Sequence, residues 1–320
     1  MRRKPIYVET DIQTEMETLW SHTQTPELHE QWDLRFSEIN YLPFDRESGP
    51  QRFLYRTRIG FGIAISGTGE TKAKLNHENG ERLSTLTFGS EQPISLISRG
   101  GGYWKYKPNG NAITFLTHYD YETRFGWVGG IFDRILFRPL FGFATAWSFD
   151  ALRLWLEKGI APAISIQRTL IHYFVVLMVA MLWIYEGFIP KLLFPEAGEL
   201  AMFQQLGWFA GYEVELLQGL GVAEIGVGVF TLIWHRKKII YGLQIGILVL
   251  LAGGAILGSP ELIQSPFNPL TLSGSMIGFC LIAAWTVRDL PEARRCLRQP
   301  IKPYKGGTAN GIHIRTSSRS

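Results

Sequence analysis

The pattern of apolar residues divides the chain into two halves of different character. The first 168 residues contain no charge-free stretch long enough to cross a membrane, whereas the remainder contains four apolar stretches of 18 to 21 residues, each with at most one charged residue. A bilayer core about 30 Å thick needs roughly 20 helical residues, because each residue of an α-helix rises about 1.5 Å. We therefore expect a soluble domain followed by four membrane-spanning helices, over Thr169–Ile189, Leu216–Trp234, Ile239–Gly258 and Leu270–Val287.

The soluble half shows strand-like and helical patterns in a definite order. Pro5–Ile12 alternates between two faces, as a half-buried strand does. Turn residues such as Asn79-Gly80 separate the later strand-like segments, because glycine and asparagine accept the positive φ of hairpin turns. A long amphipathic helix over Phe132–Lys158, kinked or split at Pro139, closes the half. Between the first strand and this closing helix we expect two short helices, over Glu15–Ser21 and Pro26–Gln31. We also expect strands over Leu34–Leu42, Arg52–Ile59, Ala64–Leu75, Arg82–Phe88, Ser95–Tyr106 and Ala112–Thr123.

This order of elements resembles the helix-grip fold of the START and polyketide-cyclase-like superfamily, also called SRPBCC. The matching stretches are Ile6–Ile12 as the first strand, Pro26–Trp32 as a second helix ending in tryptophan, and Ile131–Lys158 as the closing helix. The resemblance covers about half of the chain, and we expect this domain over residues 1–160. It implies an α+β domain in which a curved sheet wraps a long helix and encloses an apolar cavity for a hydrophobic ligand.

Aromatic residues of the strands are the candidates for lining such a cavity, since ligand pockets combine apolar walls with a few polar groups. The candidates are Tyr55, Phe88, Trp104, Phe115, His118 and Tyr119. The alternative for each ring is plain core filling, and for His118 a satisfied or surface histidine. No catalytic residue and no metal site are indicated, because this half lacks a Gly-x-Ser-x-Gly elbow and its histidines lack ligand spacing. The sequence favours a binding protein over an enzyme and leaves the cofactor unknown.

Three sequence blocks characterise the membrane half. They are Trp183–Pro195 (WIYEGFIPKLLFP), Gly219–Gly228 (GLGVAEIGVG) and Ser265–Leu272 (SPFNPLTL). In this order and spacing they resemble the DoxX-like family of small four-helix membrane proteins, over about Arg168–Val287, and we expect that domain at residues 168–290. The family is named after a subunit of a quinone-linked terminal oxidase, but its relatives occur attached to various soluble domains. The resemblance therefore implies no particular redox role.

Charged residues in these blocks are the candidates for a membrane site. Glu224 lies near the middle of the second span, where a charge costs at least about 2.5 kcal/mol and is normally turned inward or neutralised. It is either a functional residue or a protonated structural glutamate. Glu186 and Lys191 lie at the outer end of the first span, where they either pair across the turn at Pro190 or sit among headgroups. Close helix approach around Glu224 is expected at Gly219, Gly221, Gly226 and Gly228.

The formal net charge of +4 is distributed unevenly. The connection between the first two spans has one lysine and four glutamates, a net charge of −3. The connection His235–Lys238 has a net charge of +3, and the segment from Arg288 onward, with eight basic and two acidic residues, has a net charge of +6. Because Lys and Arg stay on the cytoplasmic side, both termini and the soluble domain are predicted to be cytoplasmic at a bacterial-type inner membrane. The basic residues lie at membrane edges, which favours lipid contact over nucleic acid. Residues 291–320 are expected to form a basic, disordered tail.

Together these features predict a membrane-tethered protein that binds a hydrophobic ligand, namely a lipid, an isoprenoid or a quinone-like molecule. The expected partners are membrane lipids and this ligand, with a homo-oligomer left open. Two other functions stay open as well. One is a subunit of a quinone-linked membrane oxidoreductase that uses Glu224, and the other is a structural membrane anchor without ligand chemistry.

Overall fold

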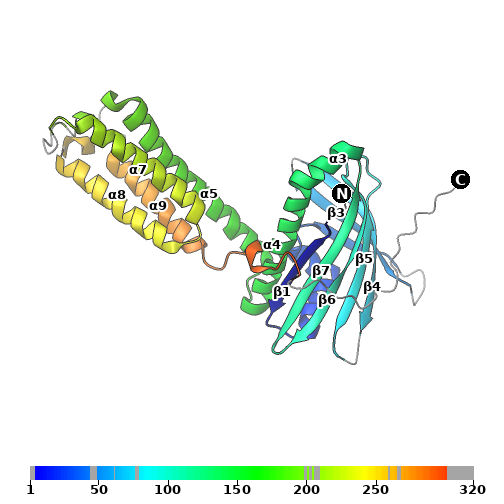
Figure 1. The fold of residues 1–320 in the computed structure, drawn as a ribbon. Helices are drawn as coiled ribbons and strands as arrows, with labels where there is room; N and C mark the ends of the chain where they lie inside the picture. The colour runs from blue at the N-terminus through cyan, green and yellow to red at the C-terminus, as the bar shows by residue number, and fades with distance from the viewer. Residues whose placement is uncertain are drawn as a thin grey trace. The chain divides into compact units, whose positions relative to one another are not determined.

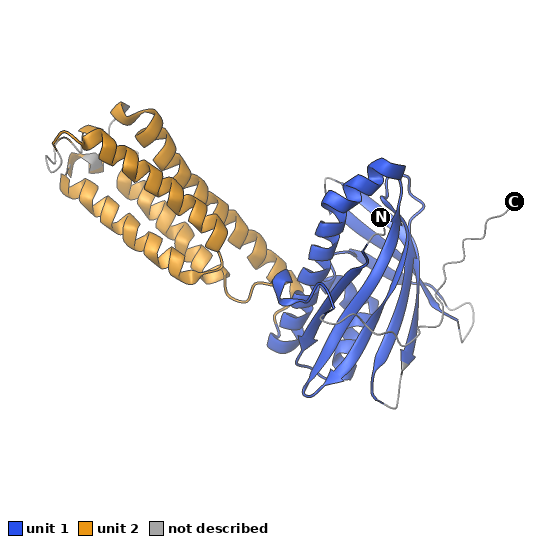
Figure 2. Ribbon diagram, viewed as in Figure 1, with its two compact units in different colours: residues 1–159, 292–320 blue, residues 160–291 orange. Residues whose placement is uncertain are grey.

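A computed structural model describes residues 4–43, 49–60, 62–75, 79–197, 200–201, 204, 210–258, 260–264 and 268–300. The chain separates into two compact units (Figure 2). One consists of residues 1–159 and 292–320, and the other of residues 160–291. Each unit is described here by itself.

The first unit is a single antiparallel sheet with helices on one face (Figure 1). Its seven strands have the order β1-β7-β6-β5-β4-β3-β2. This is the α+β helix-grip architecture expected from the sequence, and that expectation is confirmed. The strands are β1 (Ile6–Ile12), β2 (Glu38–Tyr41), β3 (Gln51–Gly60), β4 (Ile63–Leu75), β5 (Arg82–Gly89), β6 (Ile97–Asn109) and β7 (Ala112–Thr123), and the helices are α1 (Met16–Gln24), α2 (Pro26–Trp32), α3 (Gly126–Phe132), the π-helical turn η1 (Asp133–Phe137) and α4 (Arg138–Lys158).

The core of this unit lies between the sheet and α4. Alternate residues of β1 are buried, namely Ile6, Val8, Thr10 and Ile12, while Tyr7, Glu9 and Asp11 are more exposed, which follows from the two-residue period of a strand. The Phe115 ring on β7 stacks on the Phe149 ring of α4, with centroids 4.4 Å apart. Burial of such large rings on both elements fixes α4 against the sheet.

The segment that follows the last span is part of this unit and corrects the expectation of a disordered tail from residue 291. Glu292 N donates to Asp150 Oδ2 at 2.7 Å, and Leu297 exchanges two backbone hydrogen bonds of 2.9 Å with Glu9 on β1. The Cys296 thiol is buried and donates to the carbonyl of Ala146 on α4 at 3.3 Å. Residues 292–300, including the 3-10 turn η5 (Ala293–Arg295), are therefore ordered, and the rest of the predicted tail lies outside the described residues.

We expect this packing to protect Cys296 from alkylation. Burial raises the pKa of its thiol to about 12, so the reactive thiolate is scarce near neutral pH. N-ethylmaleimide should label Cys296 slowly in the folded protein, with the peptide identified by mass spectrometry. Leu297→Pro removes the N–H that bonds to Glu9 and should speed labelling, whereas Leu297→Ala keeps that bond and should not. Equal labelling rates in the two variants would contradict the packing.

The second unit contains the membrane-spanning helices. They are α5 (Pro162–Phe188), α7 (Glu213–Trp234), α8 (Lys238–Gly258) and α9 (Pro269–Thr286), with the shorter turns η2 (Ile189–Leu193), η3 (Pro195–Ala197) and η4 (Pro260–Gln264). Four helices among the described residues are long and apolar enough to span a bilayer, as predicted. The first begins at Pro162 instead of Thr169, because the apolar run locates the membrane-embedded part of a helix and not its first residue.

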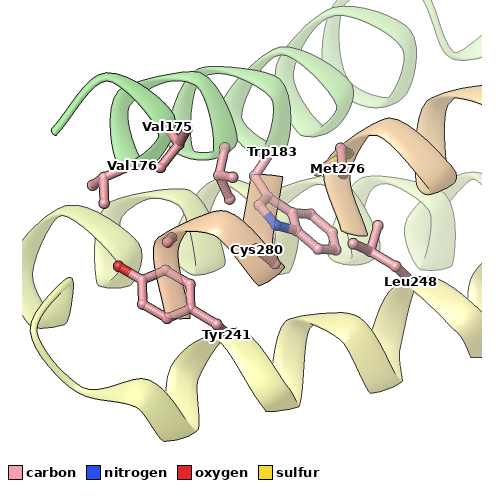
Figure 3. Close-up of a cluster of buried hydrophobic side chains, with 9 residues drawn as sticks. Val175, Val176, Trp183, Tyr241, Leu248, Met276 and Cys280 are labelled. Carbon is pink, nitrogen blue, oxygen red and sulfur yellow. The ribbon is translucent and has the colours of Figure 1, made fainter. Parts of the chain in front are cut away.

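The bundle core combines apolar packing with buried polar groups. Figure 3 shows Trp183 of α5 among side chains of α8 and α9, including Leu248, Met276 and Cys280. Trp183 Nε1 donates to Gln244 Oε1 at 2.9 Å, so the buried indole N–H is satisfied within the bundle. His172 of α5 is also fully buried, with its Nε2 3.1 Å from Nδ1 of His235.

Candidate functional site

The three sequence blocks of the membrane half contribute to one cavity in the second unit. Its volume is about 1060 Å³. Described residues of each block line it: Trp183 and Lys191 from the first, Glu224 from the second, and Asn268 from the third. The full lining is Trp183, Tyr185, Glu186, Lys191, Leu220, Glu224, Leu248, Leu250, Leu251, Ala252, Gly254, Ala255, Gly258, Asn268, Pro269, Thr271, Leu272, Ser273, Ser275 and Met276.

A buried ion pair lies in the cavity wall. Lys191 Nζ is 2.9 Å from Glu224 Oε2, and the two side chains are only 4% and 7% exposed. Lys191 Nζ also donates to the backbone carbonyl of Glu186 at 3.2 Å. Lys191 is therefore buried in the bundle and not exposed to headgroups, and the Glu224 carboxyl group has a lysine partner.

Local backbone geometry brings Lys191 into the bundle. Ile189–Leu193 form one π-helical turn directly after α5, with Pro190 in its first positions. A π turn widens the helix by one residue, which changes the face on which the following side chains lie. Lys191 consequently lies inside the bundle, although a lysine at the end of a span ordinarily extends toward the headgroups.

Close approach of α5 and α7 brings the two charged residues within reach. A Cβ added to Gly221 would lie 2.6 Å from the carbonyl oxygen of Gly187 and 2.8 Å from Lys191 Cβ. At Gly228 it would lie 2.8 Å from the carbonyl oxygen of Ala180. The expected close approach is thus present at Gly221 and Gly228. It is absent at the other two predicted positions, Gly219 and Gly226, where an added Cβ would have no neighbour within 4 Å among the described residues.

The cavity has polar and apolar walls. The pair Lys191–Glu224 and the hydroxyl groups at the start of α9 supply hydrogen-bond donors and acceptors. Asn268 caps α9, its Oδ1 accepting from Thr271 N at 3.1 Å. Apolar side chains form the remainder, chiefly Leu220, Leu248, Leu250, Leu251, Leu272 and Met276. A site of this composition matches a molecule with an apolar body and a polar group.

The candidates of the helix-grip domain separate onto two faces of the sheet. Trp104, Phe115 and Tyr119 point toward the helices: the Trp104 ring lies 6.0 Å from Trp32 of α2, and Tyr119 Oη lies 2.7 Å from Thr145 Oγ1 of α4. Tyr55 belongs to a buried cluster, against which Phe88 packs, that comprises Phe36, Ile39, Phe53 and Tyr55. These contacts are those of core-filling rings.

His118 lies on the opposite face of β7 from Phe115 and Tyr119. Its ring lies beside Tyr103, its direct partner on β6, with centroids 5.7 Å apart, and beside Tyr7 of β1 at 6.4 Å. Residues an odd number of positions apart on a strand point to opposite faces, so His118 cannot share the inner face with Tyr119. Partial burial lowers the pKa of its imidazole, which is consistent with a histidine packed between two rings.

An ion pair that sequence reasoning missed lies inside the helix-grip domain. Arg35 Nε and Nη2 donate to the two carboxylate oxygens of Asp33 at 2.8 and 2.6 Å, and both residues are buried. The guanidinium also lies 5.3 Å from the centre of the Tyr119 ring. Burial by itself raises the pKa of Asp33, but the Arg35 charge and its hydrogen bonds outweigh this and hold that pKa well below its ordinary value. The signal in the sequence is the pair Asp-x-Arg directly after α2.

Metal binding has no candidate in the part of the chain that the structure describes. There, no group of three or more His, Cys, Asp or Glu side chains is arranged to hold one ion.

Comparison with known proteins identifies similar chains. Residues 180–281 match the DoxX-like family, which confirms the resemblance in the membrane half. The chain is 46% identical over 302 residues to YndG of Bacillus subtilis (strain 168), described as an uncharacterized membrane protein, and the match covers 93% of this chain and 99% of YndG.

Two solved structures that are similar to this chain each match less than half of it. TTHA0849 from Thermus thermophilus has a TM-score of 0.34 and 15% identity, with 43% of this chain and 86% of that chain covered. A STAR-related lipid transfer protein from Xanthomonas axonopodis has a TM-score of 0.36 and 12% identity. That match covers 48% of this chain and 85% of the lipid transfer protein chain.

Proposed function

We propose a ligand-binding function for this chain, which belongs to the same family of membrane proteins as YndG and contains a DoxX-like domain. In this proposal the bundle cavity holds a hydrophobic molecule with a polar group, of the lipid, isoprenoid or quinone-like class. The observation that carries the proposal is the cavity of about 1060 Å³, which has largely apolar walls and a buried Lys191–Glu224 pair on its polar side.

The size and chemistry of the cavity support this class of ligand. Pockets for small molecules commonly measure about 300–1,000 Å³ and combine apolar walls with a few polar groups that fix orientation. The paired charges of Lys191 and Glu224 largely cancel, so they suit an uncharged ligand group. A hydroxyl could both donate and accept hydrogen bonds there, and a carbonyl could accept one from Lys191.

Ligand exchange with the bilayer follows from the position of α8. Leu250 lines the cavity and is 76% exposed, so the cavity reaches the surface of the bundle. That surface faces lipid in a membrane-spanning helix. A molecule dissolved in the bilayer would therefore reach the polar wall without passing through water. For the helix-grip domain, binding of a second hydrophobic molecule stays a prediction.

The test is mass spectrometry of lipid extracts and of the intact full-length protein, purified from membranes in mild detergent. We expect a hydrophobic molecule to co-purify with the wild type and to be lost in Ala255→Trp, which fills the cavity from α8. Leu243→Trp adds the same side chain to an exposed position of α8 outside the lining and should retain the molecule.

Three outcomes of that experiment separate the functions. Loss of the molecule in the first variant alone supports the proposal. A quinone whose reduction state changes with an electron donor, and only when Glu224 is intact, would favour the oxidoreductase subunit. Absence of any bound molecule from the wild type would contradict ligand binding and leave a structural anchor.

Both termini are proposed to be cytoplasmic, which gives a separate prediction. The connection His235–Lys238 and the residues after Arg288 are strongly basic, and positive charge is retained on the cytoplasmic side. A reporter active only in the cytoplasm should work when fused at Ser320 or inserted after Lys237, and one inserted after Glu261 should not. Activity of a periplasm-only reporter at Ser320 would overturn the proposed orientation.

A further inference from the structure

The cavity of the bundle occupies only part of the length of the four spans, and buried hydrogen bonds locate it along that length. At one end, His172 Nε2 of α5 lies 3.1 Å from His235 Nδ1, directly after α7, and His172 Nδ1 lies 3.2 Å from Thr286 Oγ1 of α9. We call this the basic end, because the basic connection His235–Lys238 lies there. The far end is where α5 and α8 end and where α7 and α9 begin.

Gln244 of α8 marks the next level from the basic end toward the far end. Its Oε1 accepts from Trp183 Nε1 of α5 at 2.9 Å, and its Nε2 donates to Thr231 Oγ1 of α7 at 3.0 Å. Cys280 Sγ of α9 lies 3.8 Å from the same Oε1, so all four spans contribute to this level. The residues that line the cavity begin at Trp183 and continue from it toward the far end.

The side of the cavity toward the basic end is closed by three buried side chains, which we call the floor. They are Trp183, Leu248 and Met276 (Figure 3). They belong to a buried apolar cluster that continues past them to Val176 and Tyr241. Because close-packed side chains leave no space for a ligand, a molecule in the cavity cannot pass the floor toward the basic end.

Helix geometry places the floor near the middle of the membrane. Leu248 lies ten positions after Lys238, where α8 begins, and Met276 lies ten positions before Thr286, where α9 ends. At about 1.5 Å per residue each interval is about 15 Å, which is half of a hydrocarbon core of about 30 Å. The cavity therefore lies in the leaflet away from the basic end. Because positive charge is retained on the cytoplasmic side, that leaflet is the outer one.

Hydrogen-bonding groups line the cavity toward the far end. Lys191 lies in η2, beyond the end of α5, and Asn268 and Thr271 lie at the start of α9. Thr271 Oγ1 donates to the carbonyl of Asn268 at 2.8 Å, and Ser275 Oγ donates to the carbonyl of Thr271 at 2.8 Å. Each of these hydroxyl groups has thereby used its proton, and its oxygen keeps a lone pair that accepts. Such a wall matches a ligand headgroup that carries hydroxyl groups as donors.

An amphiphile in a bilayer leaflet has the same gradient, with its headgroup at the surface and its apolar body toward the midplane. We propose that the cavity takes an amphiphile with a hydroxyl-bearing headgroup from the outer leaflet. The headgroup lies beside Lys191 and Thr271, and the apolar body lies against the floor. This inference names the class and the source of the ligand for the proposed function, on which it rests. It also uses the proposed cytoplasmic location of both termini.

The test follows the bound molecule in oriented membrane vesicles that contain the full chain. Cyclodextrin exchange replaces the lipids of the exposed leaflet with isotopically heavy total lipids of the same cells. The protein is then purified at once, and its bound molecule is analysed by mass spectrometry. The bound molecule should gain severalfold more heavy isotope in right-side-out vesicles than in inverted vesicles. Ala255→Trp, which fills the cavity, should carry no heavy molecule, whereas Leu243→Trp should behave as the wild type.

Two cysteine variants measure on which side of the membrane each end of the bundle lies. Glu261→Cys lies at the far end, between α8 and α9, and Lys237→Cys lies at the basic end, and both positions are exposed. A membrane-impermeant maleimide should label the first variant in right-side-out vesicles and the second in inverted vesicles. Cys280 and Cys296 are buried, and unsubstituted protein treated in parallel gives their background labelling.

The possible failures are distinguishable. Heavy isotope in the bound molecule from inverted vesicles alone, or equally from both preparations, would overturn the outer-leaflet source and leave ligand binding intact. A bound molecule without a hydroxyl group would overturn the assignment of the headgroup. Reversed maleimide labelling would overturn the orientation of the spans and with it the choice of leaflet. Absence of any bound molecule from the wild type would contradict the proposed function and this inference together.

Discussion

Glu224→Leu should lower the free energy of unfolding of the membrane domain by about 3–5 kcal/mol, because it leaves the Lys191 ammonium buried without its counter-charge. Lys191 Nζ lies 2.9 Å from Glu224 Oε2, and neither side chain reaches the surface appreciably. Removing one partner from such a pair is strongly destabilising, whereas removing both partners together is often close to neutral. The double variant Lys191→Met with Glu224→Leu should therefore recover most of the lost stability.

The measurement is a double-mutant cycle on the detergent-solubilised full chain, followed by thermal and denaturant unfolding. The coupling between the two positions should be favourable and large, since contacting charged residues are not additive. Glu261→Gln is the control, because it removes an exposed carboxylate from the same domain and should change stability by no more than about 1 kcal/mol. Additive losses in the two single variants would mean that the pair is not coupled.

The Lys191–Glu224 pair also changes how the effect of Glu224→Gln on stability and function must be interpreted. For an isolated neutral carboxyl, glutamine would be an innocuous replacement that keeps a hydrogen-bonding head of the same size. Opposite a buried lysine, the same change removes a charge and should destabilise the bundle, though less than leucine does because the amide still accepts a hydrogen bond. A functional test at this position therefore needs the double variant as its reference.

Sequence patterns predicted the elements that have a local cause. Span length, turn dipeptides and the alternation of β1 each depend on neighbouring residues, and these elements are found in the structure. The Asn268 cap of α9 has a local cause too, because a cap and its partners lie within four residues of each other.

Pairings across the fold had no such local signal. Lys191 and Glu224 come from different helices, and their contact depends on a π turn and on the closeness of α5 and α7. The orientation of His118 depends on the register of β7, where a shift of one residue reverses the face. Glu292 bonds to Asp150, which lies 142 positions earlier, so composition alone suggested disorder where the chain is ordered.

The glycines of α7 give the second large expected effect. Gly221→Ala should destabilise the bundle by about 1–3 kcal/mol, because the new methyl group must displace backbone rather than a flexible side chain. Its Cβ would lie 2.6 Å from the carbonyl oxygen of Gly187 and 2.8 Å from Lys191 Cβ, closer than packed atoms tolerate.

Gly226→Ala is the matched control on the same helix, because an added Cβ there would have no neighbour within 4 Å among the described residues. Alanine has the higher helix propensity, by about 1 kcal/mol, so this variant should be neutral or slightly stabilising. The unfolding curve of Gly221→Ala should therefore shift to lower stability than the wild type, while that of Gly226→Ala should stay in place or shift to higher stability. Separation of α5 from α7 should also pull Lys191 away from Glu224, so Gly221→Ala combined with Glu224→Leu should lose less than the sum of the two single changes. Equal stability of the two glycine variants would contradict the close crossing on which the geometry of the ion pair depends.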